Sequence, residues 1–109
     1  MDSKNALDAL AALSQETRLD AFRLLVRHEP DGLPAGEIAR DLQVPANTLS
    51  THLAILSRAG LVTSERHSRV IQYRADVDGL RALMLFLAKD CCQGRPELCE
   101  PLLAELTCC

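Results

Sequence analysis

The sequence predicts a mainly α-helical fold with one small β-hairpin, made of about five helices and a two-stranded wing. A short helix, a turn and a second helix are indicated over residues 34–60 by two prolines and a glycine. Residues 62–74 follow directly and hold two β-rich runs joined at residues 67–69, which is typical of a hairpin. This order of elements is that of a winged helix-turn-helix, and the length favours one domain over residues 1–109.

Two further helices are expected before this unit. Residues 5–13 are rich in alanine and carry leucines at helical spacing, which allows close packing against another helix. Ser14 stands where the N-cap of a second helix, residues 15–28, would lie. That second helix is apolar nearly all round, so we expect it to be buried at the centre of the domain. A turn at residues 30–32 then leads into the helix-turn-helix.

The helix-turn-helix itself is defined by residues that start and stop helices. Pro34 is tolerated in the first turn of a helix over residues 34–42. Pro45 breaks the chain before the second helix, residues 46–59, and Gly60 is placed to end that helix. One face of the second helix is apolar and is expected to pack onto the domain, with Leu49, Leu53 and Leu56.

The opposite face of this second helix is small, polar and lightly charged. Short hydrogen-bonding side chains let a helix approach base edges in the major groove, and arginines nearby can reach phosphates. We therefore predict double-stranded DNA as the partner; the alternative is a solvated helix face. The predicted DNA-binding residues are Asn47, Thr48, Ser50, Thr51, Arg58, Arg66 and Arg69. His52, at the edge of the buried face, is interpreted as packing or phosphate-contacting rather than metal-binding.

The charge distribution fits this prediction although the net charge does not. The whole chain carries a formal charge of −3. Residues 47–74, however, contain four arginines and one glutamate, so a basic region sits on an acidic remainder. Binding to DNA should therefore depend strongly on salt.

A last helix is expected over about residues 77–92, with Asp76 or Asp78 as its cap. Its apolar side chains do not fit one face: Leu80, Leu83, Met84 and Leu87 share a side, while Leu85 and Phe86 lie toward the other. In so short a chain the second cover is most simply another subunit, so we predict a homodimer through the first and last helices. A twofold dimer also sets two DNA-reading helices roughly 34 Å apart.

The sequence predicts no contact with a membrane. No basic region followed by an apolar run marks a signal peptide at the start, and the longest apolar run, near Leu83, is too short to span a bilayer. We therefore expect a cytoplasmic protein, in which the five cysteines stay reduced.

All five cysteines lie in residues 91–109, here called the cysteine tail. Cys91 and Cys92 end the last helix, and Gly94 and Pro96 favour a reversal that returns Cys99 to the pair. Three thiolates suit a soft, three-coordinate ion such as As(III) or Sb(III), which would act as an inducer and not as a permanent cofactor. The predicted ligands are Cys91, Cys92 and Cys99, with Cys108 and Cys109 as possible additional ligands.

Other interpretations of the cysteines remain open. They could be inert, form a redox switch, or bind structural zinc through four of the five. The negative end of the helix dipole disfavours thiolates, so free thiols at the end of the last helix should be poorly ionised. A site in which ligand binding drives deprotonation is therefore favoured over a peroxide-reactive thiol. No anion-cradling loop precedes any cysteine, so a thiol-dependent arsenate reductase is not favoured and no enzyme activity is expected.

Three segments carry a family resemblance: Leu49-Ser50-Thr51-His52-Leu53-Ala54-Ile55-Leu56 with Ala59-Gly60-Leu61-Val62, Ser14-Gln15-Glu16-Thr17-Arg18-Leu19, and the wing with Tyr73. As a set they resemble the ArsR family of metalloid-responsive repressors along nearly the whole chain. The resemblance implies a homodimeric repressor that leaves its operator when an inducer binds.

The inducer site differs between subgroups of that family. Many arsenic-sensing relatives carry a C-V-C pair where this chain has Pro34 and Gly36. Zinc-sensing relatives use carboxylates and histidines on the last helix, and this last helix has no histidine. The vicinal pair with one later cysteine is similar to a third subgroup, which binds As(III) at the C-terminal end.

Overall fold

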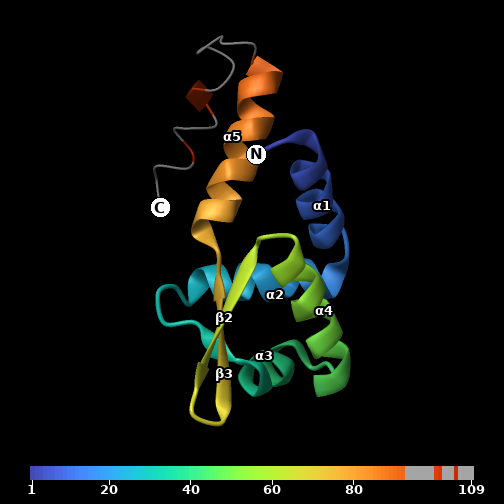
Figure 1. The fold of residues 1–109 in the computed structure, drawn as a ribbon, viewed down its shortest axis with the longest axis vertical. Coiled ribbons are helices and arrows are strands. Elements are labelled where there is room, and N and C mark those ends of the chain that lie inside the picture. The colour runs from blue at the N-terminus through green and yellow to red at the C-terminus, as the bar shows by residue number, and fades with distance from the viewer. Residues whose placement is uncertain (93–99, 102–104, 106–109) are drawn as a thin grey trace.

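The computed structural model describes residues 1–92, 100–101 and 105, with side chains of the last helix described up to Ala88. Its elements are α1 Ser3–Leu13, α2 Glu16–Arg27, β1 Leu33–Pro34, α3 Ala35–Leu42, α4 Ala46–Arg58, β2 Val62–His67, β3 Val70–Ala75 and α5 Val77–Cys92 (Figure 1). The predicted winged helix-turn-helix fold is confirmed, including the break at Pro45 and the end of α4 before Gly60, whose φ is 80°.

The junction between α1 and α2 differs from the prediction. Asp2 caps α1, since its Oδ1 accepts from Asn5 N at 2.7 Å. Ser14 does not cap α2: its hydroxyl donates back to Ala11 O at 2.8 Å and satisfies the end of α1. The cap of α2 is Gln15, whose Oε1 accepts from Arg18 N at 2.8 Å. The connection is so short that its first polar residue serves the preceding helix.

One core lies between α1, α2, α3, α4 and the base of the sheet. Its largest fully buried side chains are Leu25, Ile38, Leu49, Leu53, Leu56 and Leu61. The prediction of a buried central helix holds only in part for α2. The helix is central, with α1, α3, α4 and β3 packed against it, and Phe22, Leu24 and Leu25 are buried. Leu19 and Val26, however, are 41% and 37% exposed, because these four elements leave part of the helix surface uncovered.

The sheet has three antiparallel strands in the order β1-β3-β2, one more than the predicted two-stranded wing. In the wing, the register runs from Val62 opposite Ala75 to His67 opposite Val70. The additional strand β1 pairs Leu33 with Tyr73. Two residues that end in a proline carry no alternating pattern, so no signal for β1 exists in the sequence.

Helix α5 starts where β3 ends. Asp76, and not Asp78, caps it, because Asp76 Oδ1 accepts from Gly79 N at 3.1 Å. The helix meets the core along the row Leu80, Leu83 and Phe86, and exposes Met84, Leu85 and Leu87. Two apolar sides are present as predicted, but their members differ from the prediction. Phe86 lies on the core side with Leu83, and Met84 and Leu87 lie on the exposed side.

None of the helices formed by the described residues is long and apolar enough to cross a membrane.

Candidate nucleic-acid interface

Helix α4 presents its polar face outward, as the sequence predicted. Three leucines of the opposite face are fully buried, so the helix cannot rotate, and Asn47, Thr48, Ser50 and Thr51 are exposed. Ser50 Oγ donates to Ala46 O at 3.1 Å and Thr51 Oγ1 to Asn47 O at 3.4 Å. These bonds use the hydroxyl protons and leave the oxygen lone pairs on the outer surface as acceptors.

The opposite end of α4 carries Arg58, which is exposed in the last turn. It lines a shallow hollow of about 280 Å³ together with Asp8 and Ala11 of α1 and with Arg18. Arg58 thus lies on the α1 side of the domain. The structure does not bring it together with the arginines of the wing.

The wing carries the other two predicted arginines, Arg66 and Arg69, both exposed. Side chains alternate between the faces of a strand, and the cross-strand pairs place Arg66 with Ile71 on the face that contains buried Val62. Glu65 lies on the other face, where its carboxylate is 3.8 Å from His67 Nε2. The only acidic residue of β2 therefore projects away from Arg66.

His52 lies half-buried against the body of the domain. Arg18 Nη1 is 3.3 Å from His52 Nδ1, and Arg18 Nε donates to Ala12 O at 2.6 Å. A guanidinium can only donate, so His52 Nδ1 is the acceptor in this contact. This contact supports the packing interpretation of His52. Sequence reasoning missed Arg18, because nothing local links it to a residue 34 positions later.

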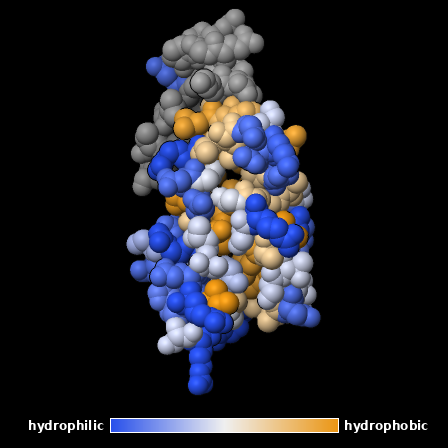
Figure 2. Space-filling view, in the orientation of Figure 1, coloured by the Kyte–Doolittle hydropathy of each residue, from blue (hydrophilic) through white to orange (hydrophobic). Residues whose placement is uncertain are grey.

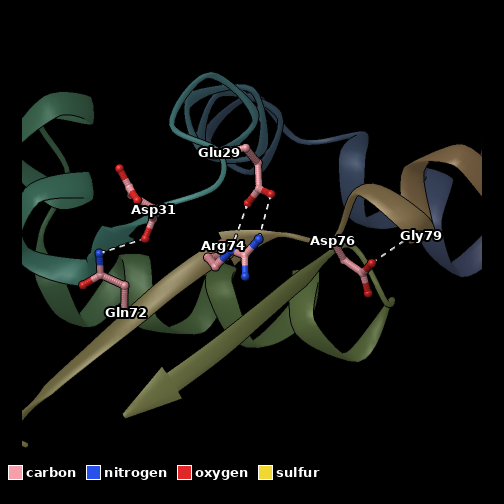
Figure 3. A network of polar contacts seen from close by, with 6 residues as sticks. All are labelled: Glu29, Asp31, Gln72, Arg74, Asp76 and Gly79. Carbon is pink, nitrogen blue, oxygen red and sulfur yellow. Dashed lines mark hydrogen bonds and ion pairs between the residues drawn. The ribbon is translucent and has the colours of Figure 1, made fainter. Parts of the chain in front are cut away.

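Arg74 is one of the four arginines of the basic region, but in the structure its charge is paired with Glu29. Its Nε donates to Glu29 Oε1 at 3.2 Å and its Nη2 to Glu29 Oε2 at 3.0 Å (Figure 3). This hydrogen bonding and the charge of Glu29 raise the pKa of Arg74. The positive charges left for a polyanion in this region are those of Arg58, Arg66 and Arg69.

The predicted inducer site is only partly within the structure. Cys91 and Cys92 form the end of α5, as expected, but their side chains are not among those that the structure describes. Cys99, Cys108 and Cys109 lie outside the described residues altogether. Among the residues that the structure does describe, no group of three or more His, Cys, Asp or Glu side chains is arranged to hold a metal ion.

These elements define a class: a winged helix-turn-helix, DNA-binding transcriptional regulator, not an enzyme. A family model described as a helix-turn-helix domain matches residues 13–65. The chain is 30% identical over 93 residues to the transcriptional activator HlyU of Vibrio cholerae, across 85% of this chain and 83% of HlyU. A structure of reduced HlyU from that species is similar at a TM-score of 0.63 and 30% identity, covering 76% of this chain and 85% of that one.

Two other solved structures are similar. The ArsR-like transcriptional regulator from Rhodococcus sp. RHA1 has a TM-score of 0.75 and 29% identity, and the match covers 87% of each chain. A possible transcriptional regulator for arsenical resistance has a TM-score of 0.65 and 30% identity, covering 73% of this chain and 80% of that one. The chain belongs to the ArsR family of winged helix-turn-helix transcriptional regulators. The predicted family and its DNA-binding activity are thereby confirmed.

Proposed function

We propose that this protein is a homodimeric repressor, which As(III) or Sb(III) releases from operator DNA by binding to thiolates at the end of α5. One observation carries the proposal: the same helix, α5, exposes an apolar side and ends at the vicinal pair Cys91-Cys92. A ligand at that pair would act directly on the helix that we assign to the dimer interface.

The DNA contacts follow from exposure and chemistry. We assign base contacts to Asn47, Thr48, Ser50 and Thr51, whose short side chains line the outer face of α4. We assign phosphate contacts to Arg66 and Arg69 of the wing and to Arg58 at the far end of α4. Phosphate contacts supply affinity and salt dependence, while the α4 face supplies sequence discrimination.

The homodimer is supported by apolar surface that one subunit leaves in water. Leu7 of α1 and Leu85 of α5 are 65% and 62% exposed, and Leu10, Met84 and Leu87 are exposed beside them on the same two helices. Figure 2 shows hydrophobic surface over the half of the molecule that holds α1 and α5, whereas the wing region is mainly hydrophilic. Burying one leucine side chain is worth about 1.5–3 kcal/mol, so a second copy on this surface is favourable.

The inducer is proposed from the donor set. Cys91, Cys92 and Cys99 offer three soft ligands, and a trivalent metalloid takes three. A relative at 30% identity is described as a possible regulator for arsenical resistance, which favours the same class of inducer. Binding must also drive deprotonation, since a helix C-terminus disfavours thiolates.

Release requires that the inducer bind the DNA-free conformation more tightly than the DNA-bound one. The start of α5 lies against the end of α4, because Asp76 N donates to Leu61 O at 2.8 Å and a side chain on Gly79 would overlap Gly60 O. A shift of α5 against the partner subunit would therefore change the spacing of the two α4 helices. This motion is part of the proposal.

A duplex selected by the protein from a random pool serves as the probe. Fluorescence anisotropy of that duplex is titrated with protein under reducing conditions, with and without arsenite. Weakened binding in arsenite supports the proposal, and unchanged binding at saturating arsenite rejects it.

The alternative function is a thiol redox-responsive regulator. It is favoured by the similarity to HlyU, whose structure has been solved in a reduced form. It predicts release by peroxide, reversed by dithiothreitol, with no response to arsenite.

A further inference from the structure

We infer that the turn between α2 and β1 holds the wing in its DNA-binding position through Glu29 and Arg74, two residues that do not themselves contact DNA. The inference rests on the proposed wing contacts to phosphate. We call the residues involved the wing anchor: Glu29, Asp31, Gly32, Gln72 and Arg74. They join two segments more than forty residues apart, at the base of β3 (Figure 3).

The first link is the ion pair. Both carboxylate oxygens of Glu29 accept from Arg74, at 3.2 and 3.0 Å, a bidentate arrangement that fixes direction as well as distance. The side chains of Glu29 and Arg74 are 21% and 44% exposed, so water competes less for this pair than for a fully exposed one. By comparison, the pair of Arg81 with Asp78 has one contact at 2.9 Å and side chains 64% and 91% exposed.

The second link involves the backbone of the same turn. Gln72 Nε2 donates to Asp31 O at 3.1 Å. Gly32, at φ 74°, packs so closely on β3 that a Cβ there would overlap Tyr73 O and the Arg74 side chain. Leu33 and Pro34 then pair with Tyr73 and Gln72. The turn is therefore fastened to β3 at consecutive positions, on main chain and side chain alike.

The wing beyond the anchor has little else to orient it. Residues 63–71 are all exposed, and a two-stranded hairpin alone is marginally stable in water. A hollow of about 490 Å³ borders the turn at Pro30 and Asp31 and the outer strand at Glu65 and His67. Arg69 lies roughly 17 Å along the strand from Arg74, so a tilt of about 10° at the base would move it by about 3 Å. That displacement is as long as a direct hydrogen bond, so the guanidinium would lose its contact geometry with a phosphate.

Glu29→Gln tests the inference, because a role in positioning the wing and a simple effect of charge predict opposite changes in DNA affinity. Removing a negative charge strengthens binding to a polyanion if charge alone matters. Disruption of the anchor instead weakens binding by roughly three- to tenfold. It also lowers the salt slope as removal of a wing arginine does, by about 0.9 per phosphate. Asp20→Asn, which removes a carboxylate from the exposed side of α2, is the charge-matched control and should bind as tightly as the parent or slightly more tightly.

Combining Glu29→Gln with Arg69→Ala in one protein separates a positioning role of Glu29 from a general decrease in stability. If Glu29 acts by placing the wing, Glu29→Gln should weaken binding far less in the Arg69→Ala background than in the parent, although the two residues do not touch. Arg74→Lys keeps the charge but removes the bidentate geometry, and it should also weaken binding. Folding of each variant is checked by circular dichroism and thermal unfolding.

Equal or tighter binding by Glu29→Gln overturns the inference, as do additive effects of Glu29→Gln and Arg69→Ala. If Glu29→Gln does not fold, Arg74→Lys decides instead, since it removes the bidentate contact with Glu29 without changing charge. Parent-like affinity and salt slope in Arg74→Lys would then reject the anchor. The proposed function is tested separately, because Arg69→Ala alone must weaken binding for the wing to bind phosphate at all.

Discussion

Arg69 and Arg74 lie five residues apart in the wing, and the structure gives them different roles. Arg69 is exposed at the tip, whereas Arg74 is held by Glu29. Alanine at Arg66 or Arg69 should weaken binding to all duplexes and reduce the salt slope by about 0.9 for each phosphate that is no longer neutralised. Anisotropy titrations at several salt concentrations measure this. Parent-like affinity and slope in both variants would remove the wing from the DNA interface.

The residues of the outer α4 face should behave differently from the arginines. Replacing Asn47 or Thr51 by alanine should alter the preference between a selected duplex and one with a changed base pair by about 1–3 kcal/mol per base contact. The salt slope should stay the same, because the same phosphates remain neutralised. Competition between the two duplexes reports the preference. An equal decrease in affinity for both duplexes would mean that the face does not read bases.

Gly32 offers a prediction on stability. At φ 74° and in contact with Tyr73 O, this position strains any side chain, so Gly32→Ala should lower the free energy of unfolding by about 1–3 kcal/mol. Gly36 is the matched control: its added Cβ would meet nothing within 4 Å, and it lies in α3. Gly36→Ala should be neutral or stabilise by up to about 1 kcal/mol. Urea unfolding of both variants checks the difference, and equal stabilities would contradict it.

For single residues the sequence predicts surface chemistry better than partners. The polar face of α4 follows from the spacing of its leucines, and its exposure is confirmed. The contacts of Arg18 with His52 and of Arg74 with Glu29 span 34 and 45 residues. Periodicity and capping signals act over a few residues, so they cannot predict such pairs.

Among the elements, α5 has a buried side and an exposed side, and the two should respond differently to a charge. Leu85 is 62% exposed and Leu83 is 4% exposed. Leu85→Glu should give a folded monomer, whereas Leu83→Glu should unfold the chain, because its charge would be buried without a partner. Sedimentation and circular dichroism distinguish the two outcomes. A dimeric Leu85→Glu variant would place the interface elsewhere.

The helices and the wing were predictable because each has its own period and its own stop signals. The exceptions have physical reasons. Ser14 bonds backward to α1, and β1 is two residues long. The predicted sides of α5 are wrong because Phe86, expected on the side of Leu85, packs onto the core beside Leu83. Which of two apolar sides faces the core is decided by tertiary packing.

On the scale of the whole molecule, the two proposed functions lie at opposite ends. Figure 1 places the wing and α3 at one end and the last turns of α5 at the other, with α1 beside α5. One connection between them is the start of α5, where Gly79 lies against Gly60 at the end of α4, and another is α1, which contacts both α5 and α4. The proposed ligand at the end of α5 would affect DNA binding through these contacts and through the subunit interface.

The most direct test of the proposed switch is operator binding by single cysteine variants across an arsenite titration under reducing conditions. We predict that Cys91→Ser, Cys92→Ser and Cys99→Ser bind the duplex like the parent but are not released by arsenite, because three thiolates are needed to hold the ion. Cys108→Ser and Cys109→Ser should be released normally. Normal release of Cys99→Ser with failure of either tail variant would move the third ligand to the tail. Normal release of both Cys91→Ser and Cys92→Ser would contradict a site at the end of α5.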